Sequence, residues 1–295
     1  MFAQAIEDIL EDQCTPAVVR AIAAGGSTAA LWQALQGAGF LELLASEDAG
    51  GAGLPLADLF PILCSFGRYT VPVPVAQTIV ARALLGSQFA MPSGMITLGA
   101  ALRREAGGAI VCSFTPYGML ADFVLAQDGD ALLLLHCAAA QREASGVHGS
   151  LTATLRWSDA RVATHVPGAG PLLPTFAAAL HAALLSGAMT RVFEMTLKHC
   201  NDRIQFGKTL GKFQAVQHQL SVMAEHVAAA SMAAEAAFHT DAAAPSLLAA
   251  AMAMGEQTQL LLLARRRPPE QLDGGAEGAA LAEAEQGPDA AAKGP

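Results

Sequence analysis

The sequence predicts a multi-domain α+β protein in three parts: an N-terminal helical domain (residues 1–92), a central antiparallel β-domain (93–170) and a C-terminal helical bundle (171–266). Two changes in hydrophobic spacing predict this order. Apolar residues recur every three to four positions in the first and third parts, as in amphipathic helices, and about every second position in the middle part, as in strands. Residues 267–295 are mostly Ala, Gly, Glu and Pro, and we predict a disordered tail there.

Short helices are predicted in the N-terminal domain. One apolar stripe at helical spacing consists of Leu56, Leu59, Phe60, Leu63 and Phe66. The glycine-rich segment 47–53 is predicted to be a turn that ends one helix and starts the next. Pro72 and Pro74 exclude a helix interior at that point, because each proline removes a backbone donor.

Six β-leaning runs predict the central domain: MITLGA, AIVCSFT, DFVLAQ, ALLLLHC, SLTATLRW and RVATHV. No helix of ordinary length fits between them, which favours a small antiparallel sheet or barrel over βαβ units. Neither GxGxxG nor GxxxxGK[ST] occurs here, so the runs indicate no Rossmann or P-loop nucleotide site.

The third part is predicted to be a bundle of three helices. The first runs from about residue 175 towards Cys200, and the third begins near Pro245 and carries Leu248, Met252 and Leu262. Between them, apolar residues at spacings of three and four predict a seam that faces the bundle: Phe213, Val216, Leu220, Met223 and Val227.

Composition narrows the classes of function. The chain has 295 residues, 53% of them hydrophobic, and this length suggests roughly two domains with real cores. Lys and Arg number 17 against 26 Asp and Glu, and the one basic cluster is Arg265–Arg267. Nucleic acid is therefore a poor partner, because phosphate binding needs clustered cations.

The cysteines and the N-terminus favour a cytoplasmic location. Five cysteines lie far apart without a CxxC pair, so neither a disulfide framework nor a zinc site is predicted. His136-Cys137 and His199-Cys200 are adjacent pairs whose side chains diverge, so no metal is expected. The first residues are acidic and amphipathic, unlike a secretory signal. The uncharged stretch 162–190 contains prolines, and alanine is its most frequent residue, unlike in a membrane span.

Residues 203–214, RIQFGKTLGKFQ, join two predicted bundle helices and carry the most informative chemistry. Arg203 offers a planar fork of donors that suits a pyrophosphate, and Phe206 can stack on a flat ring. Gln214 can hydrogen-bond an adenine edge or a ribose. From the residues alone, an ordinary helix–helix turn in which Arg203 caps the preceding carbonyls remains the alternative.

The segment resembles the acyl-CoA dehydrogenase signature R-x-x-F-G-x-x-[LI]-x-x-[FL]-Q. A second resemblance lies near the N-terminus, in Trp32, Leu35, Gly39, Phe40, Glu47, Asp48, Gly50, Gly51, Gly53 and Leu54. The order of helices, sheet and bundle is also that of the family, and the resemblance covers about residues 1–264.

The resemblance implies an FAD-dependent enzyme that oxidises an acyl-CoA thioester between its α- and β-carbons. It implies that Arg203, Gln205, Phe206 and Gln214 bind the FAD of a neighbouring subunit in a homo- or hetero-oligomer. It further implies an electron-transfer flavoprotein as electron acceptor and a role in fatty acid or lipid catabolism. The acyl chain stays open: straight, branched and steroid side-chain thioesters all fit.

Gln271, Gly274 and Gly275 resemble the family's Q-x-x-G-G segment, which also touches FAD. A chance match in a biased tail is the alternative. After it, AEGAALAEAEQGPDAAAKGP replaces the family's aromatic-rich ending, as a truncation or frameshift would.

A catalytic base is missing from the positions that the family uses. One position falls around Ala177, and the other falls near position 298, beyond Pro295. The sheet departs as well, because Thr115-Pro116-Tyr117-Gly118 and Trp157-Ser158 only faintly match the family's flavin-contacting motifs. The chain is therefore expected to be either a base-less subunit of a heteromeric enzyme or a truncated dehydrogenase, inactive by itself. A helical scaffold that keeps the fold without FAD is the alternative from another class.

Overall fold

The N-terminal part is helical, as the apolar spacing predicts. The structure is a computed structural model that describes residues 2–255, apart from positions 87, 88, 90, 101, 106, 148, 160, 162, 241 and 243. Its first helices are α1 (Phe2–Gln13), α2 (Pro16–Ala23), α3 (Ala29–Gly37), α4 (Leu56–Arg68) and α5 (Val75–Leu85). The predicted glycine-rich turn lies between α3 and α4, where Gly50 has a φ of 78°, a left-handed conformation that glycine adopts at little cost.

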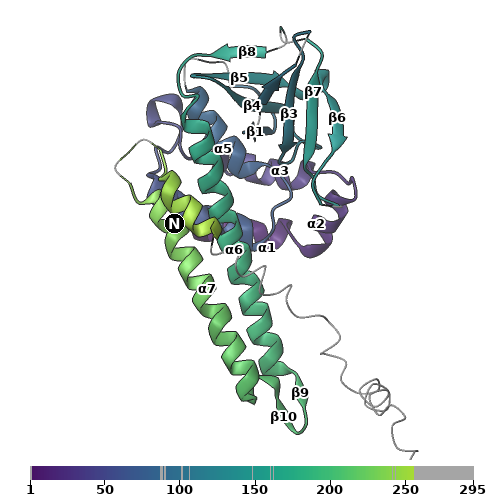
Figure 1. Cartoon of the computed structure of the whole chain (residues 1–295), viewed down its shortest axis with the longest axis vertical. Coiled ribbons are helices and arrows are strands. Elements are labelled where there is room, and N and C mark those ends of the chain that lie inside the picture. The colour runs from purple at the N-terminus through teal and green to yellow at the C-terminus, as the bar shows by residue number, and fades with distance from the viewer. Residues whose placement is uncertain are drawn as a thin grey trace, which may run out of the picture. The chain divides into compact units, whose positions relative to one another are not determined.

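The middle part contains strands β1 (Ile96–Gly99), β2 (Leu102–Arg104), β3 (Ile110–Thr115), β4 (Phe123–Asp128), β5 (Ala131–His136), β6 (Gln141–Ala144), β7 (Ala153–Trp157) and β8 (Ala163–Val166). Among the described residues they form two four-stranded sheets, ordered β1-β4-β5-β8 and β2-β3-β7-β6 (Figure 1). One pairing corrects the expectation of an antiparallel domain. β1 runs parallel to β4, with Ile96 opposite Phe123, whereas the other described pairings within these two sheets are antiparallel.

In the sheet β1-β4-β5-β8, the central strands β4 and β5 have buried residues on both faces. Val124, Ala126, Leu133 and Leu135 belong to the core shared with the second sheet, whereas the intervening Leu125 and Leu132 belong to the core shared with the helices. This explains the uninterrupted apolar run ALLLLH, because a strand with two buried faces does not alternate. Trp157 is also core, fully buried, with its Nε1 donating to the His136 carbonyl at 2.9 Å.

The C-terminal part is dominated by two long helices, α6 (Leu172–Asp202) and α7 (Gln214–Phe238), which pack together along their length (Figure 1). The short strands β9 (Ile204–Gln205) and β10 (Lys208–Thr209) connect them. The predicted seam on α7 is partly buried from Phe213 to Met223 and buried at Val227, and alanines continue it to Phe238.

A further helical segment spans residues 247–255 and begins after Ser246, whose Oγ accepts from the Ala249 N–H. The expected third helix is therefore present, and its buried face is formed by alanines. Ala250 and Ala253 are buried, whereas Leu248 is 73% and Met252 60% exposed. Leu262 and the predicted tail lie outside the described residues, and the domain boundaries at 92, 170 and 266 remain predictions.

Helix α6 is long and apolar enough, by length and composition, to cross a membrane. Half of its most apolar 18-residue window is buried within the protein. Buried core helices of folded domains can have the same length and apolar composition as a membrane-spanning helix.

Helices α4 and α6 cross in direct backbone contact through two glycines. A Cβ on Gly67 would overlap the backbone of Leu184, and a Cβ on Gly187 would overlap the backbone of Cys64. Because neither obstacle is a movable side chain, any larger residue must push the helices apart.

We expect Gly187→Ala to lower the free energy of unfolding by at least about 2 kcal/mol, since overpacking of a dense core costs this much or more. Urea unfolding of the two proteins measures the difference. Gly37→Ala is the matched control, because a Cβ there meets open space at the end of α3, and it should change stability by less than about 1 kcal/mol. Equal effects at the two positions would contradict the contact.

Candidate functional site

The predicted FAD-binding segment forms a β-hairpin between α6 and α7. Gln205 pairs with Lys208 and Ile204 with Thr209, so Phe206 and Gly207 make a two-residue turn. Their φ angles are 51° and 77°, the positive pair that a type I′ turn requires. Glycine adopts this conformation readily, but a phenylalanine in it is strained.

Backbone hydrogen bonds fix the hairpin to the end of α6. Arg203 is the C-cap of the helix, and its N–H donates to the His199 carbonyl at 2.9 Å. The Arg203 carbonyl in turn accepts from the Leu210 N–H at 2.9 Å. The backbone of Arg203 therefore does the capping, and its guanidinium makes no hydrogen bond or ion pair within the described part of the chain.

The structure brings Arg203, Gln205, Phe206 and Gln214 to one end of the α6–α7 pair, with their side chains exposed. Phe206 is 91% exposed, and its ring lies edge-on to that of Phe213, at 6.3 Å between centroids. Lys208, unlike Arg203, has its charged group in contact with a ring of this chain, because its Nζ lies 4.2 Å from the centroid of the Phe213 ring. The hairpin and the start of α7 thus present an arginine, an aromatic ring and two amides that the described part of the chain leaves exposed. Gln271, Gly274 and Gly275 lie outside the described residues.

A pocket of about 220 Å³ lies at the opposite part of α6, where the helix meets α5 and the strands β1 and β3. Its described lining residues are Gln77, Leu98, Ala100, Ser113, Phe114, Pro116, Ala177, Leu180 and His181. Most of this lining is apolar, which suits a hydrocarbon chain.

A β-bulge shapes the strand side of the pocket. The register between β3 and β7 shifts between Cys112 and Thr115, and Phe114 at the shift has a φ of 50°. Bulges re-aim side chains near functional sites, and here Phe114 is turned outward to the pocket. Thr97 Oγ1 holds the Pro116 carbonyl at 2.6 Å, which fixes the segment after the bulge.

Tyr117, next to this segment, is not an available base. Its hydroxyl donates to the Val71 carbonyl at 3.1 Å, and burial raises the pKa of Tyr117 to about 12. The phenol therefore stays protonated near neutral pH.

Three residues decide what the pocket can do chemically. Ala177, 8% exposed, occupies the position around which the sequence resemblance places a base in some relatives, so no carboxylate is present there. Gln77 on α5 is 3% exposed, and its amide has no hydrogen-bond partner in the described part of the chain. His181 lies one turn after Ala177, and its Nδ1 is 2.8 Å from the Ala177 carbonyl oxygen.

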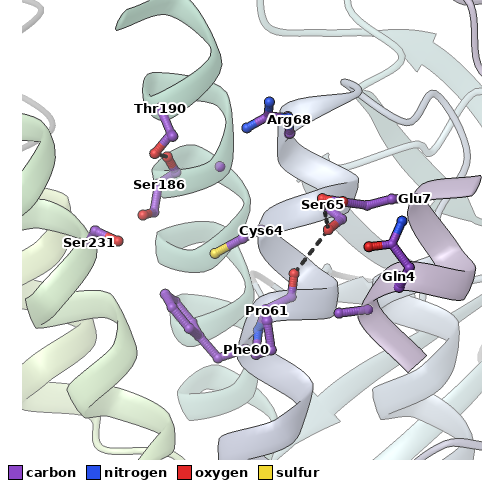
Figure 2. Close-up of a pocket in the computed structure, with 12 residues that line it drawn as sticks. Gln4, Glu7, Phe60, Pro61, Cys64, Ser65, Arg68, Ser186, Thr190 and Ser231 are labelled. Atoms are coloured by element: carbon purple, nitrogen blue, oxygen red, sulfur yellow. Dashed lines mark hydrogen bonds between the residues drawn. The ribbon is translucent and has the colours of Figure 1, made fainter. Parts of the chain in front are cut away.

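A second cavity, of about 310 Å³, lies between α1, α4, α6 and α7 (Figure 2). Its charged residues are already paired: Arg68 contacts Glu194 at 2.7 Å, and Ser65 donates to Glu7 at 3.1 Å. Burial raises the pKa of the Cys64 thiol to about 12, so it is a poor nucleophile. Glu194 is held here by Arg68, away from the apolar pocket.

The described residues contain no cluster of three or more His, Cys, Asp or Glu side chains that could hold a metal ion. Sequence reasoning missed Gln77, Phe114 and His181 as site residues. The signal nearest to them was Thr115-Pro116-Tyr117-Gly118, which follows the bulge directly.

Comparisons with known proteins agree with this architecture. A family model described as the acyl-CoA dehydrogenase C-terminal domain matches residues 175–255. Acyl-CoA dehydrogenase IpdE2 of Mycolicibacterium smegmatis is 31% identical over 265 residues, covering 86% of this chain and 79% of that protein.

Solved structures show the same fold. A variant of the Tcur3481-Tcur3483 steroid ACAD superposes with a TM-score of 0.71 at 25% identity, covering 86% of this chain and 81% of that one. The ChsE4-ChsE5 complex from Mycobacterium tuberculosis gives a TM-score of 0.71 at 21% identity, covering 85% and 79%. The predicted fold class is confirmed, and the chain belongs to the acyl-CoA dehydrogenase family.

Proposed function

We propose that this chain is a subunit of an FAD-dependent dehydrogenase that introduces an α,β double bond into an acyl-CoA thioester. The observation that carries the proposal is the hairpin at the end of α6, where the four family-matching side chains are exposed and the Arg203 guanidinium makes no hydrogen bond or ion pair within the described residues. A fold alone does not need such an arrangement, because it leaves a phenylalanine ring in water and strains its backbone.

The residues at the tip fit one end of FAD. The unpaired Arg203 guanidinium suits the pyrophosphate, the exposed Phe206 ring suits stacking, and Gln205 and Gln214 supply amides for the adenosine. When bound, FAD supplies the acceptor for the hydride that leaves the β-carbon.

The hairpin serves a neighbouring subunit. With 31 residues, α6 is about 46 Å long, more than the diameter of a small domain, and the hairpin and the pocket lie towards its opposite ends. We therefore propose that each FAD is held between a pocket on one chain and a hairpin on another. Two of the similar structures are described by pairs of protein names, Tcur3481-Tcur3483 and ChsE4-ChsE5, which favours a hetero-oligomer.

The chain's own pocket would bind the acyl group. Leu98, Ala177 and Leu180 form apolar walls that exclude water, and the buried Gln77 amide can hydrogen-bond an oxygen of the ligand. We further propose an electron-transfer flavoprotein as electron acceptor, a role in lipid catabolism and a cytoplasmic location.

Loss of the Arg203 fork should weaken FAD binding. We expect Arg203→Ala to raise the dissociation constant for FAD by about tenfold or more, the cost of a charged hydrogen bond, in equilibrium dialysis of the assembled protein. Lys208→Ala is the matched control, since Lys208 is already placed against Phe213 and lacks the fork. Equal losses in the two variants would mean that the hairpin is only structural.

The Phe206→Asn variant should lose FAD affinity without losing folding stability. Asn-Gly is a preferred type I′ turn, so the free energy of unfolding should stay the same or rise by up to about 1 kcal/mol. FAD retention should nevertheless fall by about fivefold or more, because a stacking partner of the cofactor is lost. Urea unfolding and flavin absorbance give the two measurements. A variant that loses stability but keeps FAD would contradict this assignment.

We expect dehydrogenase activity to require assembly of this chain with a second subunit. The chain alone should be inactive towards acyl-CoAs, and co-expression with a second subunit of the same fold should yield a yellow complex that reduces a dye in the presence of acyl-CoA. A colourless complex that takes up no FAD would favour the scaffold alternative. Turnover by the isolated chain as a monomer would contradict the shared cofactor site.

A further inference from the structure

The pocket has one imidazole among its described lining residues, that of His181. Among its described lining residues, α5, β1 and the β3 bulge contribute amide, apolar and hydroxyl groups, and α6 contributes Ala177, Leu180 and His181. None of the described lining residues is Asp, Glu, Lys, Arg, Cys or Tyr. His181 therefore supplies the nitrogen base of this described lining.

The hydrogen bond to Ala177 fixes which nitrogen of His181 carries the proton. A backbone carbonyl oxygen can only accept, so Nδ1, 2.8 Å from it, must be the N–H donor. In the neutral ring, Nε2 then has a free lone pair. This is the tautomer that a general base needs, held by the helix that carries it.

We propose that His181 Nε2 accepts the α-proton of the acyl thioester, in place of the absent carboxylate. The inference rests on the proposed function. The α C–H bond breaks and its proton goes to Nε2, and its electron pair forms the Cα=Cβ bond. The β C–H bond breaks with its electron pair, which passes as a hydride to oxidised FAD.

The exposure of the His181 ring allows the base to lose its proton after each reaction cycle. Its ring lies at the pocket and is exposed to solvent, so the accepted proton can pass to water after each cycle. Two other acid–base groups are not available to the pocket: Glu194 pairs with Arg68 in the second cavity, and the Tyr117 hydroxyl donates to the Val71 carbonyl.

The test is affinity labelling of the full chain in its assembled, FAD-loaded form. 2-Bromohexanoyl-CoA places an electrophilic carbon where the α-carbon binds, and attack by Nε2 forms an N–C bond as bromide leaves. Peptide mapping should find the label on His181 of this chain, and excess hexanoyl-CoA should protect it. His165 on β8, exposed and outside the pocket lining, should stay unlabelled.

Two variants add kinetic readouts. His181→Gln keeps a donor for the Ala177 carbonyl but loses the base, and turnover by the complex should fall by about 10²- to 10⁴-fold. His165→Gln should change it less than about twofold. Imidazole added to His181→Ala should restore a concentration-dependent part of the rate, which a purely structural role would not produce.

The outcomes separate the two proposals. If the complex binds neither FAD nor hexanoyl-CoA, the proposed function fails, and the role of His181 fails with it. If both bind but the label misses His181, or if His181→Gln keeps more than half of the activity, His181 is not the base, and the proposed function stands.

Discussion

The backbone contact between α4 and α6 at Gly67 and Gly187 is the constraint on which the rest of the structure depends. Two glycines facing each other's helices allow an approach that side chains would prevent. The contact fixes both the position and the direction of α6. One end of that helix then forms the floor of the apolar pocket, and the other end carries the hairpin.

The sheet β1-β4-β5-β8 completes the pocket from the other side. Because Leu125 and Leu132 pack on the helices while Val124 and Leu133 pack on the second sheet, the strands cannot shift register without exposing one of the two cores. The pocket forms where this rigid pair of sheets meets α5 and α6, at the β3 bulge. Its shape is thus set by packing on three sides, whereas the hairpin is set only by its own turn and by the end of α6.

The sequence was sufficient to predict those features that depend on residues close together in the chain. The helix–sheet–helix order, the turn at 47–53 and the connection of two bundle helices by residues 203–214 follow from spacing, glycine positions and a twelve-residue motif. The parallel pairing of β1 with β4 could not be predicted, because it depends on which strands meet in space. The burial of Ala250 and Ala253, rather than of the larger Leu248 and Met252, likewise depends on what the segment 247–255 packs against. Gln77 and His181 lie about a hundred positions apart, and only the fold brings them to one pocket.

The exposed apolar residues on α6 and the hairpin affect the solubility of the chain. Val192 and Met195 on α6, and Ile204 and Phe206 on the hairpin, leave apolar surface in contact with water. The hairpin strands are only two residues each, too short for edge-to-edge pairing with another chain. The exposed apolar side chains can still associate non-specifically with other proteins. If the second subunit proposed above covers that surface, chain made in excess of that subunit would be lost to chaperones and proteases, and the abundance of the two subunits would be linked.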